Sequence, residues 1–104
     1  MQITEYGDTL VVVIDPQNCA ALWKLLEPKI SPAQRRIVLD FTQVSFINSV
    51  NIAQIIAARQ RATAQGAEVR VAGLKENIRS VFRILRLDRL FSLDMGLEAA
   101  LAKG

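Results

Sequence analysis

The sequence contains no histidine and only one cysteine, Cys19, among its 104 residues. Histidine is the commonest general base in enzymes and the commonest neutral metal ligand, so its absence removes the usual side chain for both roles. One cysteine without histidine cannot form a Cys/His zinc site within one chain. Cys19 also cannot form an internal disulfide, which is typical of a reducing compartment. We expect it to be a small buried hydrophobic residue.

Phosphate-binding loops and grouped carboxylates are missing as well. The five glycines are scattered singly along the chain, so no glycine-rich loop is present to hold a phosphate. The aspartates that follow segment ends share no ligand spacing; these are Asp15, Asp40, Asp88 and Asp94. We therefore predict that the protein is not an enzyme and that it holds no metal and no cofactor.

Long hydrophobic runs are absent too. No apolar run approaches the roughly 20 residues that cross a bilayer, and the first five residues lack the basic-then-apolar layout of a signal peptide. We expect a cytoplasmic protein without membrane insertion. Hydrophobic residues at 51% and charged residues at 22% are typical of a globular chain, and the length suits a single domain over residues 1–104.

The apolar periodicity predicts an α/β fold. Strands are expected over residues 2–6, 10–14, 37–41 and 68–72, the first two joined by a Gly7-Asp8 hairpin turn, and Leu90-Phe91 is expected to add a short last strand. Helices are expected from Asp15-Pro16 to Glu27, from Asn48-Ser49 to Gly66, over 75–86, and after an Asp94 cap. Residues 30–36 form a connector. This order predicts a mixed, mostly parallel sheet of four to five strands covered by about four helices.

Two of these helices carry clear faces. In the first, the stripe of Cys19, Leu22, Trp23 and Leu26 is expected to be buried; in the third, Ile78, Val81, Phe82 and Leu85 are. The opposite face of the third helix carries Lys75, Arg79, Arg83 and Arg86 in a chain of net charge +3. Nucleic acid, an anionic membrane and an acidic protein are possible partners of such a face. Because base-stacking aromatics and nucleic-acid motifs are missing, we favour a solvated helix face without direct nucleic-acid binding.

The central part of the chain resembles a known family. The resemblance lies in a hydrophobic strand ending in Leu39-Asp40, in the segment Val44-Ser45-Phe46-Ile47, and in a serine, Ser49, that opens an Ile/Ala-rich helix. Residues 66–69, 71–74 and 86–91 are similar to the closing half of that family. Asp15 aligns with an aspartate that commonly follows its early strand, and residues 19–22 align with its first helix. The sequence thus resembles the STAS domain, the fold of bacterial anti-sigma factor antagonists, over nearly its whole length.

The resemblance implies a regulatory role. In the switchable members the helix opens with Asp-Ser-Ser/Thr-Gly, and the first serine is phosphorylated by a partner serine kinase that doubles as the anti-sigma factor. Ser49 falls at that serine, whereas Asn48, Val50 and Asn51 replace the other three residues of the motif. The resemblance therefore implies that Ser49 is a phosphoacceptor and that Asp15, Asn48, Ser49, Val50 and Asn51 bind the partner. The implied partners are an anti-sigma factor with serine kinase activity and a serine phosphatase, with the domain a monomer or weak dimer.

The sequence is compatible with several functions. Ser49 and the small size favour a partner-switching regulator, whereas the residues at 48, 50 and 51 favour an interaction module without phosphorylation, such as a regulatory subunit of a lipid-transport ATPase or a signalling scaffold. Nucleotide or small-ligand binding is a third option. Asn48 or Ser49 can also act simply as an N-cap, which stabilises a helix by about 1 kcal/mol.

Overall fold

Four strands form a single sheet in the order β1-β2-β3-β4. The computed structural model describes residues 2–30 and 35–101, so the Ser31-Pro32 part of the expected connector lies outside the described residues. The strands are β1 (Gln2–Tyr6), β2 (Thr9–Val13), β3 (Arg36–Asp40) and β4 (Glu68–Ala72). β1 pairs antiparallel with β2, while β2–β3 and β3–β4 are parallel. The predicted mixed, mostly parallel sheet is confirmed, and β1 and β4 are its two edges.

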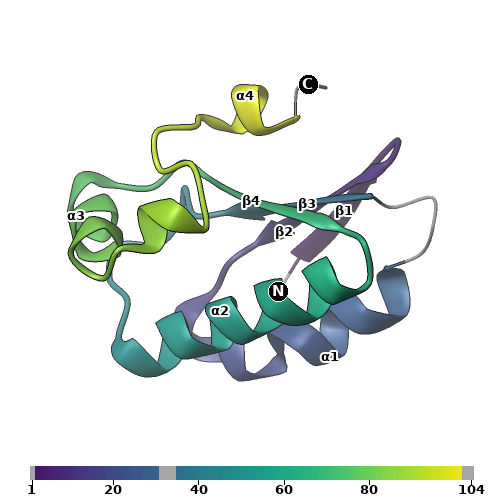
Figure 1. The fold of residues 1–104 in the computed structure, drawn as a ribbon, viewed down its shortest axis with the longest axis horizontal. Coiled ribbons are helices and arrows are strands. Elements are labelled where there is room, and N and C mark those ends of the chain that lie inside the picture. Colours follow the sequence, from purple (N-terminus) through teal and green to yellow (C-terminus); the bar gives the residue numbers. More distant parts are fainter. Residues whose placement is uncertain (1, 31–34, 102–104) are drawn as a thin grey trace.

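The helices lie on both faces of this sheet. They are α1 (Leu22–Leu26), α2 (Ser49–Ala64), α3 (Glu76–Ile84) and α4 (Leu97–Leu101), with the 3₁₀ helices η1 (Pro16–Ala21), η2 (Glu27–Lys29) and η3 (Leu87–Arg89). Figure 1 shows α1 and α2 side by side along one face, α4 over the opposite face, and α3 beyond one end of the strands. The α/β architecture predicted from the sequence is therefore confirmed, including its four α-helices.

The segment after β2 begins as a 3₁₀ helix, although one α-helix was expected there. Asp15 caps it as predicted: its carboxylate accepts a hydrogen bond from the Gln17 N–H at 3.0 Å. The α-helical part ends at Leu26 because Pro28 lacks the N–H that a continuing helix needs. The expected apolar stripe is buried at Cys19, Leu22 and Leu26 and half-buried at Trp23. Burial, and then the charge of Asp15, raises the pKa of the Cys19 thiol, which keeps it neutral.

The main core lies between the sheet and helices α1, α2 and α3. Its centre is a pair of aromatic rings, Phe41 and Phe82, in edge-to-face contact with centroids 5.7 Å apart. Phe91 extends the cluster, 6.4 Å from Phe82. A smaller cluster on the other face joins Val11, Val38, Ala72 and Ala100, packed against Met95, Leu97 and Leu101. The inward packing expected for the last helix is thus confirmed.

Three expectations about the last third of the chain are wrong. Leu85 is 50% exposed, because α3 ends at Ile84 and Arg86 turns the chain with a positive φ of 62°, so that Leu87 takes the inward place. Leu90-Phe91 forms no strand: it follows η3, and Phe91 packs into the core instead of pairing with a neighbour.

Asp94 does not cap the last helix. α4 begins at Leu97, three residues later, and the Asp94 carboxylate instead accepts a hydrogen bond from Arg83 at 3.1 Å and pairs with Arg79 at 3.4 Å. The two guanidinium groups of α3 attract this carboxylate, and the chain must run on to Gly96 before its backbone turns into a helix. The single charge of Asp94 offsets one of the four positive charges on the basic face.

The backbone conformation after β4 requires a glycine at position 73, which a substitution can test. Its φ is +70°, and a Cβ there would overlap Cγ2 of Thr42. We expect Gly73→Ala to lower the free energy of unfolding by about 1–2 kcal/mol from the backbone conformation alone, with a further loss from the overlap. Urea denaturation measures this change. Adding Thr42→Ser, which removes Cγ2, should restore only the overlap part; an unfolding free energy unchanged by Gly73→Ala contradicts the prediction.

Candidate functional site

The start of α2 is held by a reciprocal pair of asparagines. Asn48 is the N-cap: its side-chain oxygen accepts a hydrogen bond from the Asn51 N–H at 2.8 Å. The Asn51 side-chain oxygen accepts one from the Asn48 N–H at 3.3 Å. This is a capping box, which satisfies two backbone donors that a helix start leaves free. The expectation that Asn48-Ser49 opens a helix is confirmed.

Asn51 also ties α2 to the segment after β2. Its amide nitrogen donates a hydrogen bond to the Pro16 carbonyl at 2.9 Å, and the residue is only 6% exposed. Asn51 was expected among the partner-binding residues, but its side chain is directed into the protein. Its side chain therefore places the start of α2 and is not exposed for contact with another protein. The same bond places the loop that carries Asp15 next to the start of α2.

Ser49 is the first residue of α2 and is exposed. None of the residues that the structure describes forms a hydrogen bond with its hydroxyl, which is free to react or to contact another protein. Two apolar side chains are also exposed, Phe46 at 68%, three residues before Ser49, and Val50 at 61%, directly after it. We call these four residues, Phe46, Asn48, Ser49 and Val50, the Ser49 surface.

The loop that presents Phe46 is fixed at several points. Phe41 and Val44 are buried, and the Thr42 N–H donates to the Asp40 carboxylate at 2.9 Å. Ser45 accepts two hydrogen bonds from the α3 end of the molecule, from the Lys75 ammonium to its hydroxyl at 3.0 Å and from the Asn77 amide to its carbonyl at 2.8 Å. No local pattern in the sequence indicates these contacts, because residues 45 and 75 are far apart in the chain. They hold Phe46 in an exposed position.

Asp15 lies at the same end of the sheet. It is partly buried, and it lines a shallow pocket of about 280 Å³ with Val13, Pro16 and Gln43. Because Asn51 is bonded to the carbonyl of the next residue, Pro16, the predicted residues 15 and 48–51 come from separate segments but meet at one end of the molecule. Asp15 is the one carboxylate among them.

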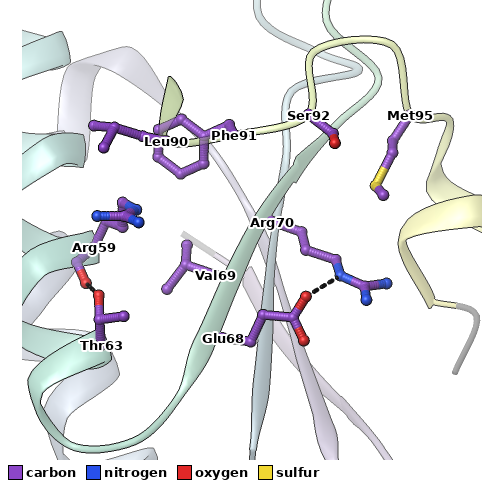
Figure 2. A pocket seen from close by; sticks show the side chains of 9 residues that line it. All are labelled: Arg59, Thr63, Glu68, Val69, Arg70, Leu90, Phe91, Ser92 and Met95. Carbon is purple, nitrogen blue, oxygen red and sulfur yellow. Dashed lines mark hydrogen bonds and ion pairs between the residues drawn. The ribbon is translucent and has the colours of Figure 1, made fainter. Parts of the chain in front are cut away.

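A second pocket lies at the far end of α2, along β4. It encloses about 260 Å³ and is lined by Arg59 and Thr63 of α2, Glu68, Val69 and Arg70 of β4, and Leu90, Phe91, Ser92 and Met95 (Figure 2). A hydrogen bond from Arg70 at 2.7 Å, with the charges of Arg70 and Arg36, lowers the pKa of Glu68. The residues of this pocket come from three separate segments of the chain and share no motif, so the pocket could not be predicted from the sequence.

Residues 2–30 and 35–101 contain neither a metal-binding cluster nor a membrane-spanning helix. No group of three or more cysteine or carboxylate residues there is placed to hold a metal ion. Among the same residues, no helix combines the length and apolar character needed to span a membrane.

The chain is similar to proteins of known family. Residues 9–95 match the family model described as Mlab, STAS domain. Over 91 residues the chain is 30% identical to BtrV of Bordetella bronchiseptica, which has a provisional assignment as an anti-sigma factor antagonist; the match covers 86% of this chain and 78% of BtrV.

Two solved structures of one protein, TM1081, share the fold. The NMR structure superposes with a TM-score of 0.81 at 15% identity, covering 95% of this chain and 83% of TM1081. The crystal structure of TM1081 from Thermotoga maritima, also provisionally assigned as an anti-sigma factor antagonist, gives a TM-score of 0.71 at 16% identity, covering 86% and 81%. The fold, the family model and the match to BtrV agree, and the chain belongs to the STAS domain family of anti-sigma factor antagonists.

Proposed function

We propose that this protein is a cytoplasmic anti-sigma factor antagonist that acts by partner switching. In this proposal the unmodified domain binds a kinase-like anti-sigma factor through the Ser49 surface, and phosphorylation of Ser49 by that partner ends the binding. A serine phosphatase would restore the binding form. The similarity to BtrV supports the class of function, and the observation that carries the proposal is the exposed, unbonded Ser49 hydroxyl between Phe46 and Val50.

The Ser49 surface has the chemistry of a docking site. Burying a phenylalanine or valine side chain fully is favourable by about 1.5–3 kcal/mol, so a partner that covers Phe46 and Val50 gains binding energy from residues that contribute little to the fold. The contacts of Ser45 with Lys75 and Asn77 hold this loop before a partner arrives, which lowers the entropic cost of docking.

A phosphate on Ser49 would act on the partner more than on the fold. It adds a charge of about −1.5 to −2 next to the positive end of the α2 dipole, where negative charge is favourable. The capping bonds of Asn48 and Asn51 do not use the Ser49 hydroxyl and remain in place. At an apolar interface, by contrast, the phosphate must lose its bound water and occupies space that the partner would fill. Both effects weaken binding of the partner. The modified domain therefore stays folded and loses affinity.

A second candidate function is a STAS interaction module that is never phosphorylated, such as a regulatory subunit of a lipid-transport ATPase or a signalling scaffold. The observation that favours it is the bulk of Val50, whose exposed side chain directly follows Ser49 and hinders approach to the hydroxyl. Asn48 and Asn51 also use their side chains for the capping box, which holds the helix start in one conformation. In this case the Ser49 surface is a permanent contact.

Incubation with the cognate kinase-like anti-sigma factor and ATP separates the two functions. We expect the intact mass to rise by one phosphate, with the group mapped to Ser49 by peptide mass spectrometry, and Ser49→Ala to stay unmodified. Ser45, a second exposed serine in the same loop, is the internal control. A native protein that remains unmodified while it binds the partner supports the constitutive module.

The variant Ser49→Asp tests the effect of charge. We expect the thermal midpoint to stay the same or to rise slightly, since an acidic residue in the first turn is favourable by about 0.3–1 kcal/mol. Affinity for the anti-sigma factor should fall at least tenfold in a calorimetric titration, and Ser49→Asn, which lacks the charge, should bind more tightly than Ser49→Asp. Equal affinity of Ser49→Asp and the native protein contradicts the switch.

The apolar part of the surface has its own test. We expect Phe46→Ala to weaken partner binding by about 1.5–3 kcal/mol, the value of one buried aromatic side chain, with little change in the unfolding free energy, because Phe46 is 68% exposed. Tyr6→Ala is the matched control, since Tyr6 is an aromatic residue of β1 that is 56% exposed. Binding that is equally sensitive to both substitutions would place the interface elsewhere.

A further inference from the structure

The edge strand β4 has outward-facing backbone groups at Val69, which lines a pocket, and at Val71, which is buried. The Glu68 N–H donates to the Arg35 carbonyl at 2.8 Å, and the Ala72 carbonyl accepts from the Phe41 N–H at 2.9 Å, so both residues point toward β3. Because successive residues of a strand alternate in direction, the N–H and C=O of Val69 point away from β3. None of the described residues hydrogen bonds with either group.

Four residues further on, at Gly73, another segment of the chain already pairs with this outer edge. The Gly73 N–H, which points the same way as that of Val69, donates to the Met95 carbonyl at 3.0 Å. The edge of β4 therefore accepts an extended segment beside it, and at Val69 the corresponding place is open to the pocket of Figure 2. Val69 is partly buried and lines this pocket.

The pocket extends to both sides of this edge. Figure 2 shows Arg59, Thr63 and Val69 on the α2 side, and Glu68 and Arg70 on the side of α4. A strand lying along β4 directs alternate side chains to these two sides. The geometry is that of strand addition, in which main-chain hydrogen bonds give affinity and pockets for alternate side chains give specificity.

The charges favour an acidic occupant. On the α4 side Glu68 pairs with Arg70 at 2.7 Å and with Arg36 at 3.6 Å, so its negative charge is balanced. On the α2 side the Arg59 guanidinium lies 5.8 Å from the centroid of the Phe91 ring and forms no ion pair with any described residue. One unbalanced positive charge therefore faces the pocket, next to an apolar floor of Val69 and Phe91.

We propose that this pocket docks an extended acidic segment of another protein as a short strand beside Val69. The residue opposite Val69 exchanges two backbone hydrogen bonds with it, and its carboxylate pairs with Arg59. The site is separate from the Ser49 surface, since Arg59 is ten residues further along α2, or about 15 Å at 1.5 Å per residue. The proposal does not depend on phosphorylation or on partner switching.

The test is an NMR titration of the ¹⁵N-labelled protein with the capped peptide Ac-Thr-Val-Glu-Val-Thr-NH₂. We expect saturable shifts centred on the Val69 amide and its neighbours in the pocket. Replacing the peptide Glu by Gln, or Arg59→Gln in the protein, should weaken binding about two- to fivefold, the usual range for an exposed ion pair. The control Arg61→Gln should bind as the native protein does, because Arg61 lies over the ring of Trp23 and does not line the pocket.

A peptide with an N-methyl group on the central Glu separates strand addition from simple charge attraction. It keeps the carboxylate but lacks the N–H that would bond to Val69, so we expect its saturable shifts to disappear. The proposal is overturned if no saturable shift occurs, if the N-methyl peptide binds equally well, if Arg59→Gln has no effect, or if the shifts map to the Ser49 surface. Free glutamate giving the same shifts would identify an anion site and would likewise overturn it.

Discussion

The position of the Ser49 surface depends on the side chain of Asn51. Its oxygen accepts from the Asn48 backbone, its amide nitrogen donates to the Pro16 carbonyl, and its own N–H is capped by Asn48. These bonds are partly buried, and leaving a fully buried polar group unpaired costs about 1–3 kcal/mol, so losing one partner here costs up to that amount. The bonds set where α2 begins relative to the segment after β2. The exposure of Ser49 follows from that placement, since the inward-facing residue of the first turn is Asn51.

The loop before α2 and the start of α2 combine buried core residues with exposed apolar side chains. Phe41, Val44 and Ile52 are buried around the loop and the helix start, while Phe46 and Val50 are left in water. Exposed side chains of this kind add nothing to the core, and single ones are common on protein surfaces. Here, however, the loop that presents Phe46 is bonded to Lys75 and Asn77 from the α3 end, so the surface is preformed. A preformed surface with exposed apolar side chains and an exposed serine fits the reversible binding that we propose.

The opposite end of α2 contributes a different chemistry. There the Gly73 N–H bonds to the Met95 carbonyl. At Val69 the edge of β4 faces the pocket that Arg59 also lines. Edge strands invite pairing with other chains and are usually protected by charge. On β4, Glu68 and Arg70 supply such charges, and Glu68 pairs with Arg70 and with Arg36 of β3, whereas Arg59 forms no ion pair with a described residue. One helix thus joins an apolar surface at its start to a polar strand edge near its end.

The local sequence was sufficient to predict a strand or helix wherever a short segment contains the residues that favour that structure. The β-branched runs determined β2 and β3, alternation determined β4, and Asn48 with Gly66 delimited α2, so that the exposed place of Ser49 at a helix start could be predicted. Prediction was wrong where distant groups compete: Asp94 pairs with Arg79 and Arg83 instead of capping α4, and Phe91 packs on Phe82 instead of extending a strand.

Only the tertiary structure decided the inward turn of Asn51, the exposure of Phe46 and the pocket at Val69. Each of these depends on atoms more than 20 residues apart in the chain, such as Asn51 and Pro16 or Lys75 and Ser45. Residue type and spacing report the preferences of a backbone segment, because those preferences act within a turn or a strand. Which polar group finds which partner is determined by the packing of whole elements, and one sequence read along its length contains no local signal of it.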